Sequence, residues 1–453
     1  MKREFYDLVI KNGTLVSPQG TLRADLGIVG EKIAAVGINL AGKREVDASG
    51  KLVLPGVIDA HTHMALPVAG TRSSDDFFTG TRAAACGGVT TIVDFTVGSA
   101  DTTIPEDIKK RQQVAKDAVI DYTFHGEVVG WKPGHEAEFR DAVALGIKTF
   151  KFYTAYGSSG RRSDSGVLYH AFRAIAEHGA TALVHCEDDD LITSLVNQLT
   201  EKERGEMMSL ARTRPPECEG AAIEQVAYYA NVTGARAHIV HVSSALGLAV
   251  VSRAKARGVQ LTAETCPQYL LLTKDVYQRE DAHLYSASPA LRSKSDQDAL
   301  WKGLRDGTLD LVATDHCPFT NAQKEWKGSF LDLPYGLPGV ETLLSFLYSE
   351  GVAKKRLALT DLPRLLCEGP ARINGLYPKK GALSIGSDAD IVIFDPEVKW
   401  TIHADDLHMN TDFSPYEGMA VRGAVDTTIS RGRIIYTDGK FQDEKGWGRF
   451  VAV

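Results

Sequence analysis

The sequence predicts an α/β protein, a (β/α)8 TIM-like barrel with a small β-sandwich domain built from both termini. Two patterns predict this fold: apolar runs alternate with amphipathic segments in the middle of the chain, and short strand-like segments occupy both ends. A chain of 453 residues is too long for one small domain and suits a large domain with a smaller one. We expect residues 1–52 and 380–453 to form the β-sandwich domain and residues 53–379 to form the barrel.

Both ends of the chain have the character of short β-strands. Residues 5–20 (FYDLVIKNGTLVSPQG) alternate polar and apolar side chains around Asn12-Gly13, a dipeptide typical of a hairpin turn. Residues 386–397 (GSDADIVIFDPE) and 424–440 (AVDTTISRGRIIYTDGK) have the same character. We therefore expect the two ends to combine in one β domain, with a hairpin at Asn12-Gly13.

The middle of the chain contains eight apolar runs of strand length, and amphipathic segments such as 166–180 and 221–235 separate several of them. The runs are residues 56–63, 90–96, 122–129, 147–154, 181–187, 237–244, 259–267 and 309–317. Eight strands with intervening helices are typical of a (β/α)8 barrel. A doubly wound sheet is the alternative, but it usually places a Gly-rich phosphate loop after its first strand. The Gly-rich residues 86–91 (CGGVTT) precede a strand instead.

Composition excludes several classes of function. The net charge of −7 argues against nucleic acid as a partner, because phosphate backbones are bound by clustered Lys and Arg. The six cysteines are scattered singly, so neither a structural zinc site nor a disulfide framework is indicated. The N-terminus lacks the pattern of a signal peptide, and no apolar run is long enough to cross a bilayer. We expect a cytoplasmic protein that binds neither nucleic acid nor membrane.

Polar side chains that can bind metal follow the ends of several predicted strands. His61 and His63 are two positions apart, so on a strand they would point to the same face. Each such residue alone has an ordinary structural explanation, for example a hydrogen-bonded histidine or an aspartate that caps a loop. In a barrel, however, all these strand ends open onto one face, where active sites are built. The six candidate ligands are His61, His63, Lys151, His185, His241 and Asp315.

Six ligands suit two metal ions better than one tetrahedral zinc ion. Imidazole and carboxylate groups favour zinc, manganese or related ions. Lys151 cannot bind metal as an ammonium, but burial and nearby cations favour its neutral amine, which can take up carbon dioxide as an N6-carboxylated, anionic bridge. The carbamate, the Asp315 carboxylate and a bridging hydroxide would then balance most of the charge of two dications.

The motifs around these residues resemble those of the cyclic amidohydrolases, and within them the D-hydantoinase/dihydropyrimidinase branch. The matching segments include GVIDAHTHMALP, TFKFYTAY, VHCED, IVHVSS, ETCPQYL, SPALR, ATDHCPF and GLPGVE, spread over nearly the whole chain. The resemblance implies that His61, His63 and Asp315 hold one ion, that His185 and His241 hold the other, and that carboxylated Lys151 bridges them. It also implies a homotetramer, with a dimer as the alternative.

The resemblance extends to three positions that contact substrate in the family. Tyr156 matches the tyrosine that donates to the substrate carbonyl oxygen, although an aromatic residue at a barrel rim can also serve packing alone. Ser288 matches the residue whose backbone contacts the cyclic imide. Tyr335 stands in YGLPG where the family commonly has asparagine, and its backbone would keep that contact. We expect the loop of residues 156–166 to lie at the rim, with Arg161 and Arg162 solvated.

The resemblance implies hydrolytic ring opening of cyclic ureides, namely 5-substituted hydantoins and dihydropyrimidines, to N-carbamoyl amino acids. A hydroxide bridging the two ions would attack the ring carbonyl, Tyr156 would stabilise the oxyanion, and Asp315 would move the proton to the leaving nitrogen. An allantoinase-type activity and a non-catalytic interaction protein of the same fold are the alternatives. Dihydroorotase is disfavoured because its family pattern has arginine where this chain has Ala65. The physiological substrate, the enantioselectivity and the native metal stay open.

Overall fold

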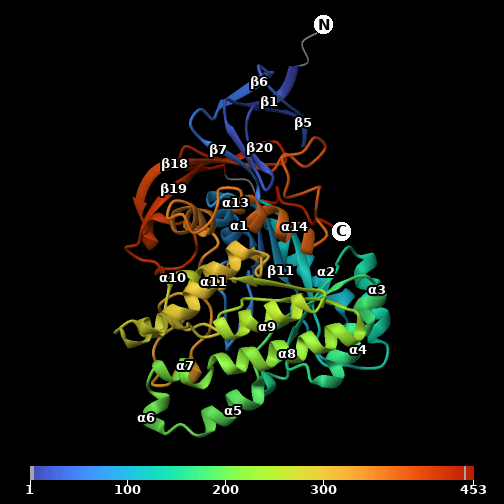
Figure 1. Ribbon diagram of the computed structural model, residues 1–453, viewed down its shortest axis with the longest axis vertical. Coiled ribbons are helices and arrows are strands. Elements are labelled where there is room, and N and C mark those ends of the chain that lie inside the picture. Colours follow the sequence, from blue (N-terminus) through green and yellow to red (C-terminus); the bar gives the residue numbers. More distant parts are fainter. Residues whose placement is uncertain (1–4, 443–444) are drawn as a thin grey trace.

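The computed structural model describes residues 5–442 and 445–453 (Figure 1). Its centre is a sheet of eight parallel strands in chain order, as predicted. The strands are β8 (Val57–Thr62), β11 (Val89–Phe95), β12 (Asp121–Glu127), β13 (Thr149–Tyr153), β14 (Thr181–His185), β15 (Arg236–Ile239), β16 (Leu261–Thr265) and β17 (Leu311–Val312). The backbone N–H of His63 donates to the carbonyl of His316 at 2.8 Å, which joins the last strand to the first and closes the barrel.

The barrel strands are buried on both faces, which is typical of parallel strands covered by helices. The covering helices are α1 (Phe77–Cys86), α2 (Ile104–Val114), α3 (His135–Ala144), α4 (Ser165–Glu177), α8 (Pro216–Thr233), α9 (Ala245–Ala256) and α11 (Lys294–Asp306). Helices α4 and α8 confirm that the amphipathic segments 166–180 and 221–235 are largely helical. Asp164 begins α4 because its carboxylate accepts a hydrogen bond from Val167 N at 2.9 Å.

Shorter elements extend the barrel at its rim. An excursion between β14 and α8 forms α5 (Asp189–Asn197), α6 (Glu201–Arg204) and α7 (Met208–Thr213), which lie at the lower end of the molecule in Figure 1. The remaining short α-helices and strands are α10 (Pro267–Leu271), α12 (Leu343–Phe346), α13 (Asp361–Pro363), α14 (Gly369–Ile373), β9 (Pro67–Val68) and β10 (Thr71–Arg72). In the described part of the chain, no helix combines the length and apolar character needed to cross a bilayer.

Two β-sheets from the ends of the chain lie above the barrel in Figure 1. One contains β1 (Phe5–Lys11), β4 (Asp25–Val29), β5 (Lys32–Gly37) and β6 (Ala41–Asp47). The other contains β2 (Thr14–Ser17), β3 (Gly20–Arg23), β7 (Leu52–Pro55), β18 (Ile391–Thr401), β19 (Ala420–Ser430), β20 (Arg433–Thr437) and β21 (Lys440–Phe441). Apolar side chains from both sheets, among them Leu26, Val53 and Ile391, share one core.

The limits proposed for the two domains stay a prediction. The division between residues 52 and 53 falls inside β7, which pairs with β18 and β2 of the terminal sheet. Residues 1–4 and 443–444 of the expected β domain lie outside the described residues.

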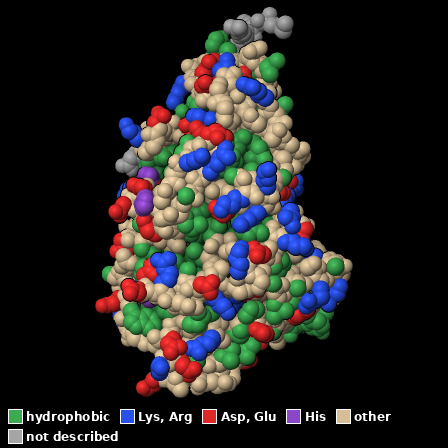
Figure 2. Space-filling view, turned by 60° about the vertical axis from the view of Figure 1, so that its left-hand side comes forward, with side chains coloured by type: hydrophobic (Ala, Val, Ile, Leu, Met, Phe, Trp, Pro, Cys, Tyr) green, Lys and Arg blue, Asp and Glu red, His purple; other side chains and the backbone are tan. Residues whose placement is uncertain are grey.

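On the face shown in Figure 2, acidic and basic side chains are interspersed.

The expected hairpin at Asn12-Gly13 is wrong. Strand β1 pairs with β4 and β6, whereas β2 pairs with β3 and β7, so the chain passes from one sheet to the other at this dipeptide. Asn12 has the positive φ of 62° that its residue type tolerates. A Cβ atom on Gly13 would lie 2.5 Å from Val53 Cγ2. The dipeptide therefore allows a sharp turn at Asn12 and a close contact between Gly13 and Val53, and it does not connect two paired strands.

A buried ionic cluster joins the terminal sheets to the N-terminal end of the barrel. The Lys380 ammonium contacts Asp121 at the start of β12, and it lies 2.6 Å from Asp390 Oδ2 and 3.0 Å from Asp388 Oδ2. The Arg431 guanidinium also contacts Asp121, with Nε 3.1 Å from Oδ1. These cations balance the aspartates, so the junction is held by paired charges.

Candidate metal centre

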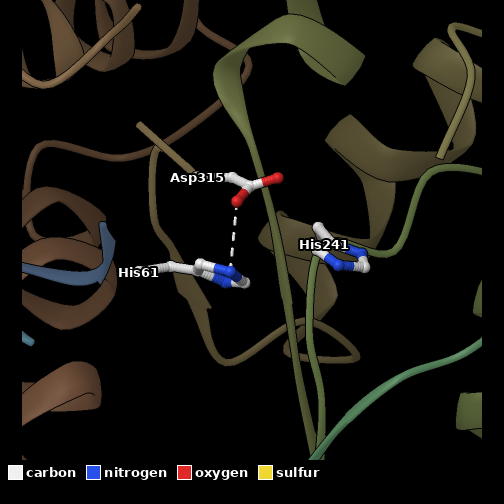
Figure 3. A group of neighbouring side chains, drawn as sticks. All are labelled: His61, His241 and Asp315. Atoms are coloured by element: carbon white, nitrogen blue, oxygen red, sulfur yellow. Dashed lines mark ion pairs between the residues drawn. The ribbon is translucent and has the colours of Figure 1, made fainter. Parts of the chain in front are cut away.

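Three of the predicted ligands face one another at the C-terminal ends of the barrel strands (Figure 3). His61 is the last residue but one of β8, His241 follows β15, and Asp315 follows β17; their ligand atoms all lie within 4.8 Å of one another. His61 Nε2 and His63 Nε2 each lie 3.1 Å from the same oxygen, Asp315 Oδ1. Strands distant in sequence thus bring two ring nitrogens and a carboxylate to one point.

A second convergence involves the other two histidines. His185 Nδ1 at the end of β14 lies 2.9 Å from His241 Nε2. The ring of His241 lies 4.6 Å from the ring of His185 and 5.5 Å from that of His61, measured between centroids. His241 therefore connects the two groups of ligands, and together they form one cluster with two points of convergence.

Lys151 is buried beside this cluster in β13. Its side chain is 1% exposed, and its Nζ lies 5.1 Å from the Phe95 ring centroid and 5.0 Å from that of Tyr153. The Phe95 ring in turn contacts the rings of His61 and His63, each at 4.7 Å. Burial lowers the pKa of Lys151 to about 8, although the charges of nearby carboxylates oppose this shift. The neutral amine needed for carboxylation is therefore accessible near neutral pH.

Two of these residues have a backbone conformation that is rare outside glycine. His241 has a φ of 41° and Asp315 a φ of 53°. Non-glycine residues held in the left-handed region cost on the order of 1–3 kcal/mol and are concentrated at functional sites. The conformation of these two strand ends is therefore consistent with the predicted site, and it is an observation independent of the side chains.

Two buried glutamates orient histidines of the cluster, and the sequence analysis missed both. His61 Nδ1 donates to Glu264 Oε1 at 2.6 Å, and His238 Nε2 donates to Glu264 Oε2 at 3.0 Å. His185 Nε2 donates to Glu187 Oε2 at 2.9 Å. The bonds of His61 and His185 leave the other nitrogen of each ring directed into the cluster, which is the usual arrangement of metal-binding histidines. The available signal was a glutamate two positions after His185, on the same strand end.

The pKa values of the cluster show that its carboxylates favour a positive charge beside them. Burial lowers the pKa of His61, but Asp315 and Glu264 outweigh this effect and raise that pKa to about 9. Burial raises the pKa of Asp315, but the charge and hydrogen bond of His61 hold it well below its usual value. Burial lowers the pKa of the other imidazoles, which leaves them neutral with lone pairs available: His63, His185 and His241.

This donor set fits divalent cations such as zinc or manganese. It offers four imidazoles, one carboxylate and one amine in a buried position. Two buried ring nitrogens, His63 Nδ1 and His241 Nδ1, have no hydrogen-bond partner, although buried polar atoms are normally bonded. A bound metal cation could take the place of the proton on His61 and balance the negative charges of Asp315 and Glu264.

Two predicted substrate contacts lie at the edge of the cluster. The Tyr156 hydroxyl donates to Ser288 Oγ at 2.8 Å, and Ser288 Oγ donates to Glu187 Oε2 at 3.0 Å. The Tyr156 ring lies 4.9 Å from the His185 ring. Burial raises the pKa of the Tyr156 hydroxyl, so the group stays protonated and able to donate. The structure thus brings Tyr156 and Ser288 next to the histidines.

Tyr335 lies farther from the histidines. Its hydroxyl donates to the Phe330 carbonyl at 3.2 Å. The Arg214 guanidinium lies between two rings, 5.7 Å from the centroid of Tyr335 and 5.8 Å from that of Tyr156, and it also bonds Glu187 Oε2 at 2.5 Å. Tyr335 is therefore connected to the cluster through Arg214 and Glu187.

Arg161 is only partly solvated, with 28% of its side chain exposed. Its guanidinium pairs with Glu127, whose side chain is 2% exposed. The buried carboxylate attracts the cation because it needs a partner out of water. Arg162 forms two hydrogen bonds to the exposed Asp190, both 2.7 Å long, and so lies at the surface.

Comparisons with known proteins agree along nearly the whole chain. Residues 52–435 match the amidohydrolase family. A D-phenylhydantoinase of Escherichia coli strain K12 is 41% identical over 457 residues, which cover 98% of this chain and 97% of that protein. The crystal structure of a dihydropyrimidinase from Brevibacillus agri is similar with a TM-score of 0.96 and 37% identity, covering 98% of both chains. A D-hydantoinase structure from Bacillus sp. AR9 has a TM-score of 0.96, 38% identity and the same coverage.

Proposed function

The chain belongs to the amidohydrolase family, and we propose that it opens cyclic ureide rings by hydrolysis at the cluster of six side chains. The observation that carries this proposal is the convergence of His61, His63, His185, His241, Lys151 and Asp315 at the mouth of the barrel. The similarity to proteins named D-phenylhydantoinase and dihydropyrimidinase supports it. It makes the chain a hydrolase of cyclic amide bonds.

In this proposal two divalent cations, zinc or alternatively manganese, occupy the cluster. His61, His63 and Asp315 would hold one ion, His185 and His241 would hold the other, and Lys151, if N6-carboxylated, would serve as a ligand to both. Bound there, the ions would lower the pKa of water and polarise a carbonyl group. The lowered pKa of Lys151, the convergence of His61 Nε2 and His63 Nε2 on Asp315, and the approach of His185 to His241 support this assignment.

Asp315 is the proposed proton carrier of the reaction. Its carboxylate is ionised at neutral pH because its pKa is held low, so it can accept a proton from the attacking water. Its position at the point where His61 and His63 converge supports this role. The proton then passes to the ring nitrogen as the amide C–N bond breaks.

Tyr156 is the proposed donor to the carbonyl oxygen of the substrate. Its protonated hydroxyl would turn from Ser288 Oγ to that oxygen and stabilise the developing negative charge. Backbone groups of Ser288 and Tyr335 would hold the ureide. We propose 5-substituted hydantoins and dihydropyrimidines as substrates, and N-carbamoyl amino acids as products. A cytoplasmic location and a homotetramer, with a dimer as the alternative, stay predictions beside this proposal.

The test is a comparison of ring-opening rates on protein whose metal content has been measured. We expect kcat/KM for dihydrouracil and 5-substituted hydantoins to exceed that for allantoin and dihydroorotate by about 100-fold or more. A chelator-treated sample and Asp315→Asn serve as controls and should both be inactive. A preference for allantoin would replace the proposed substrate class, and a metal-replete protein that opens none of these rings would overturn the proposed function.

A further inference from the structure

Lys324 is a buried lysine outside the metal cluster that the proposed reaction does not use. Its side chain is fully buried, and burial lowers its pKa to about 7. Its Nζ donates three hydrogen bonds, to Leu284 O at 3.1 Å, Ser286 O at 3.0 Å and Ser286 Oγ at 2.8 Å. An ammonium has three N–H donors, so all of them are used, but every acceptor is neutral. Such burial is costly, and the position needs an explanation beyond packing.

The acceptors of Lys324 lie on a loop that carries a proposed substrate contact. Ser286 precedes Ser288 by two residues, and the Tyr269 hydroxyl fixes the other side of Ser288 by donating to Pro289 O at 2.8 Å. The path from Lys324 to Ser288 is therefore short, and hydrogen bonds restrain the backbone on both sides of Ser288, at Ser286 and at Pro289.

Ser286 also holds the loop that carries Tyr335, the other proposed substrate contact. Ser286 Oγ donates to Pro334 O at 2.9 Å, and Gly336 N donates to Ser286 O at 3.0 Å. Tyr335 lies between these two residues. A Cβ atom on Gly336 would lie 2.4 Å from the carbonyl oxygen of Cys317, so this loop is also confined from its other side. Ser286 thus connects the backbone on both sides of Tyr335 to Lys324.

We propose that Lys324 is a positioning residue for substrate: by holding Ser286, it keeps the loops of Ser288 and Tyr335 at the separation that the cyclic ureide requires. This inference rests on the proposed function. The backbone contacts of both loops act on the ring before and during the reaction, so their loss weakens binding of the ground state and the transition state alike. Loss of Lys324 should therefore raise KM more than it lowers kcat.

The variant Lys324→Met tests this separation of effects, because methionine fills a similar volume without donors. We expect KM for dihydrouracil and for a 5-substituted hydantoin to rise about tenfold, with kcat changed by less than about threefold. Metal content and the circular dichroism spectrum should match those of the wild type. Lys327→Met is the matched control, since it removes the same charge from an exposed position three residues away and should leave KM unchanged.

Ser286→Ala provides a second, independent variant. It removes the hydroxyl that links Lys324 to Pro334, so it should raise KM as well. In the double variant the rise in KM should be smaller than the product of the two single rises, because both substitutions disrupt the same hydrogen bonds at Ser286. This variant also decides the question if Lys324→Met fails to fold.

Two results would overturn the inference while the wild type stays active. One is a KM of Lys324→Met within about twofold of the wild-type value. The other is an equal loss of kcat and metal content, which would show a general structural role. Failure of the proposed function is distinguishable, because it shows in the wild type, as absence of ring opening by the metal-replete protein.

Discussion

Two buried lysines, Lys151 at the barrel mouth and Lys380 at the junction with the terminal sheets, have opposite surroundings. Both side chains are 1% exposed. Burial lowers the pKa of Lys380, but Asp390, Asp121 and Asp388 outweigh it and raise the pKa above its usual value. Lys151 has aromatic rings around its Nζ, and burial lowers its pKa to about 8. The charge of Lys380 is therefore balanced by aspartates of the protein. The Lys151 amine has no such partner and is more easily deprotonated, so it is available for a reaction or a ligand.

The same contrast holds for the acidic groups of the two regions. Asp121, Asp388 and Asp390 are close enough together to resemble a metal site, yet the Lys380 ammonium contacts all three. At the barrel mouth, His61 Nε2 and His63 Nε2 converge on Asp315 Oδ1 instead, each at 3.1 Å. A group of carboxylates is therefore weak evidence for metal when a lysine already pairs with it, whereas imidazoles that converge on one carboxylate are stronger evidence.

The largest expected effect follows replacement of Lys151. Lys151→Ala removes the proposed bridge, so we expect metal content to fall to one ion or none and kcat/KM to fall by about 1000-fold, equal to ~4 kcal/mol of activation free energy. The fold should persist, since no ion pair of the described residues depends on this amine. Elemental analysis and circular dichroism check both statements.

Lys148→Ala is the matched control for that variant. Lys148 immediately precedes β13, at the opposite end of the strand from the cluster, and its loss should leave rate and metal content unchanged. Unchanged metal content and rate in Lys151→Ala itself would contradict the bridging role.

Lys380→Met should show the opposite pattern. It leaves three buried aspartates without their shared cation, which costs about 3–5 kcal/mol of unfolding free energy. Metal content per folded molecule and kcat should stay at the wild-type values. Urea unfolding with parallel activity assays measures both. A normal unfolding free energy combined with lost activity would reverse the roles assigned to the two lysines.

The fold was predictable because each barrel strand is a short apolar run. The eight predicted runs correspond to the eight strands of the barrel, since burial on both faces removes polar side chains from a strand. Asn12-Gly13 was misleading because the dipeptide determines only the local turn. Which sheet each following strand joins depends on partners distant in sequence, such as Leu52 and Asp47.

The candidate ligands were found because they lie at strand ends that a barrel brings together. Glu264 and Arg161 show what sequence patterns leave out. Glu264 lies inside a predicted strand, and its bond to His61 joins residues 203 positions apart. The partner of Arg161, Glu127, belongs to a different strand end. Such pairings depend on the rotation of strands within the closed barrel, which periodicity does not specify.

Glu264→Gln should have an intermediate effect on the metal centre. The amide keeps the shape but loses the charge that orients His61, so we expect metal affinity to fall by about 10–100-fold. Glu417→Gln is the control: it alters another glutamate–histidine pair, with His403 Nδ1 at 2.6 Å, in an exposed position away from the predicted ligands. Competition with a chelator measures the affinities. Equal affinities for the two variants would show that Glu264 has no role in orienting a ligand.

A further expected effect, on the pH dependence of stability, concerns Lys324, which has polar contacts like Lys380 but only neutral acceptors. Its pKa is lowered to about 7, whereas an unfolded lysine has a pKa of about 10.4. Between these values the unfolded state binds the extra proton, so wild-type stability rises with pH relative to Lys324→Met. Below about pH 7 the difference between the two proteins should be constant. Urea unfolding at several pH values measures it, and a difference independent of pH up to about 10 would contradict the lowered pKa.

The most direct test is anomalous diffraction from crystals of metal-replete protein grown with bicarbonate. We expect two metal ions, one bound by His61, His63 and Asp315 and the other by His185 and His241, with a carbamate on Lys151 between them. An unmodified Lys151, or a single ion or none despite excess metal, would contradict the proposed binuclear centre.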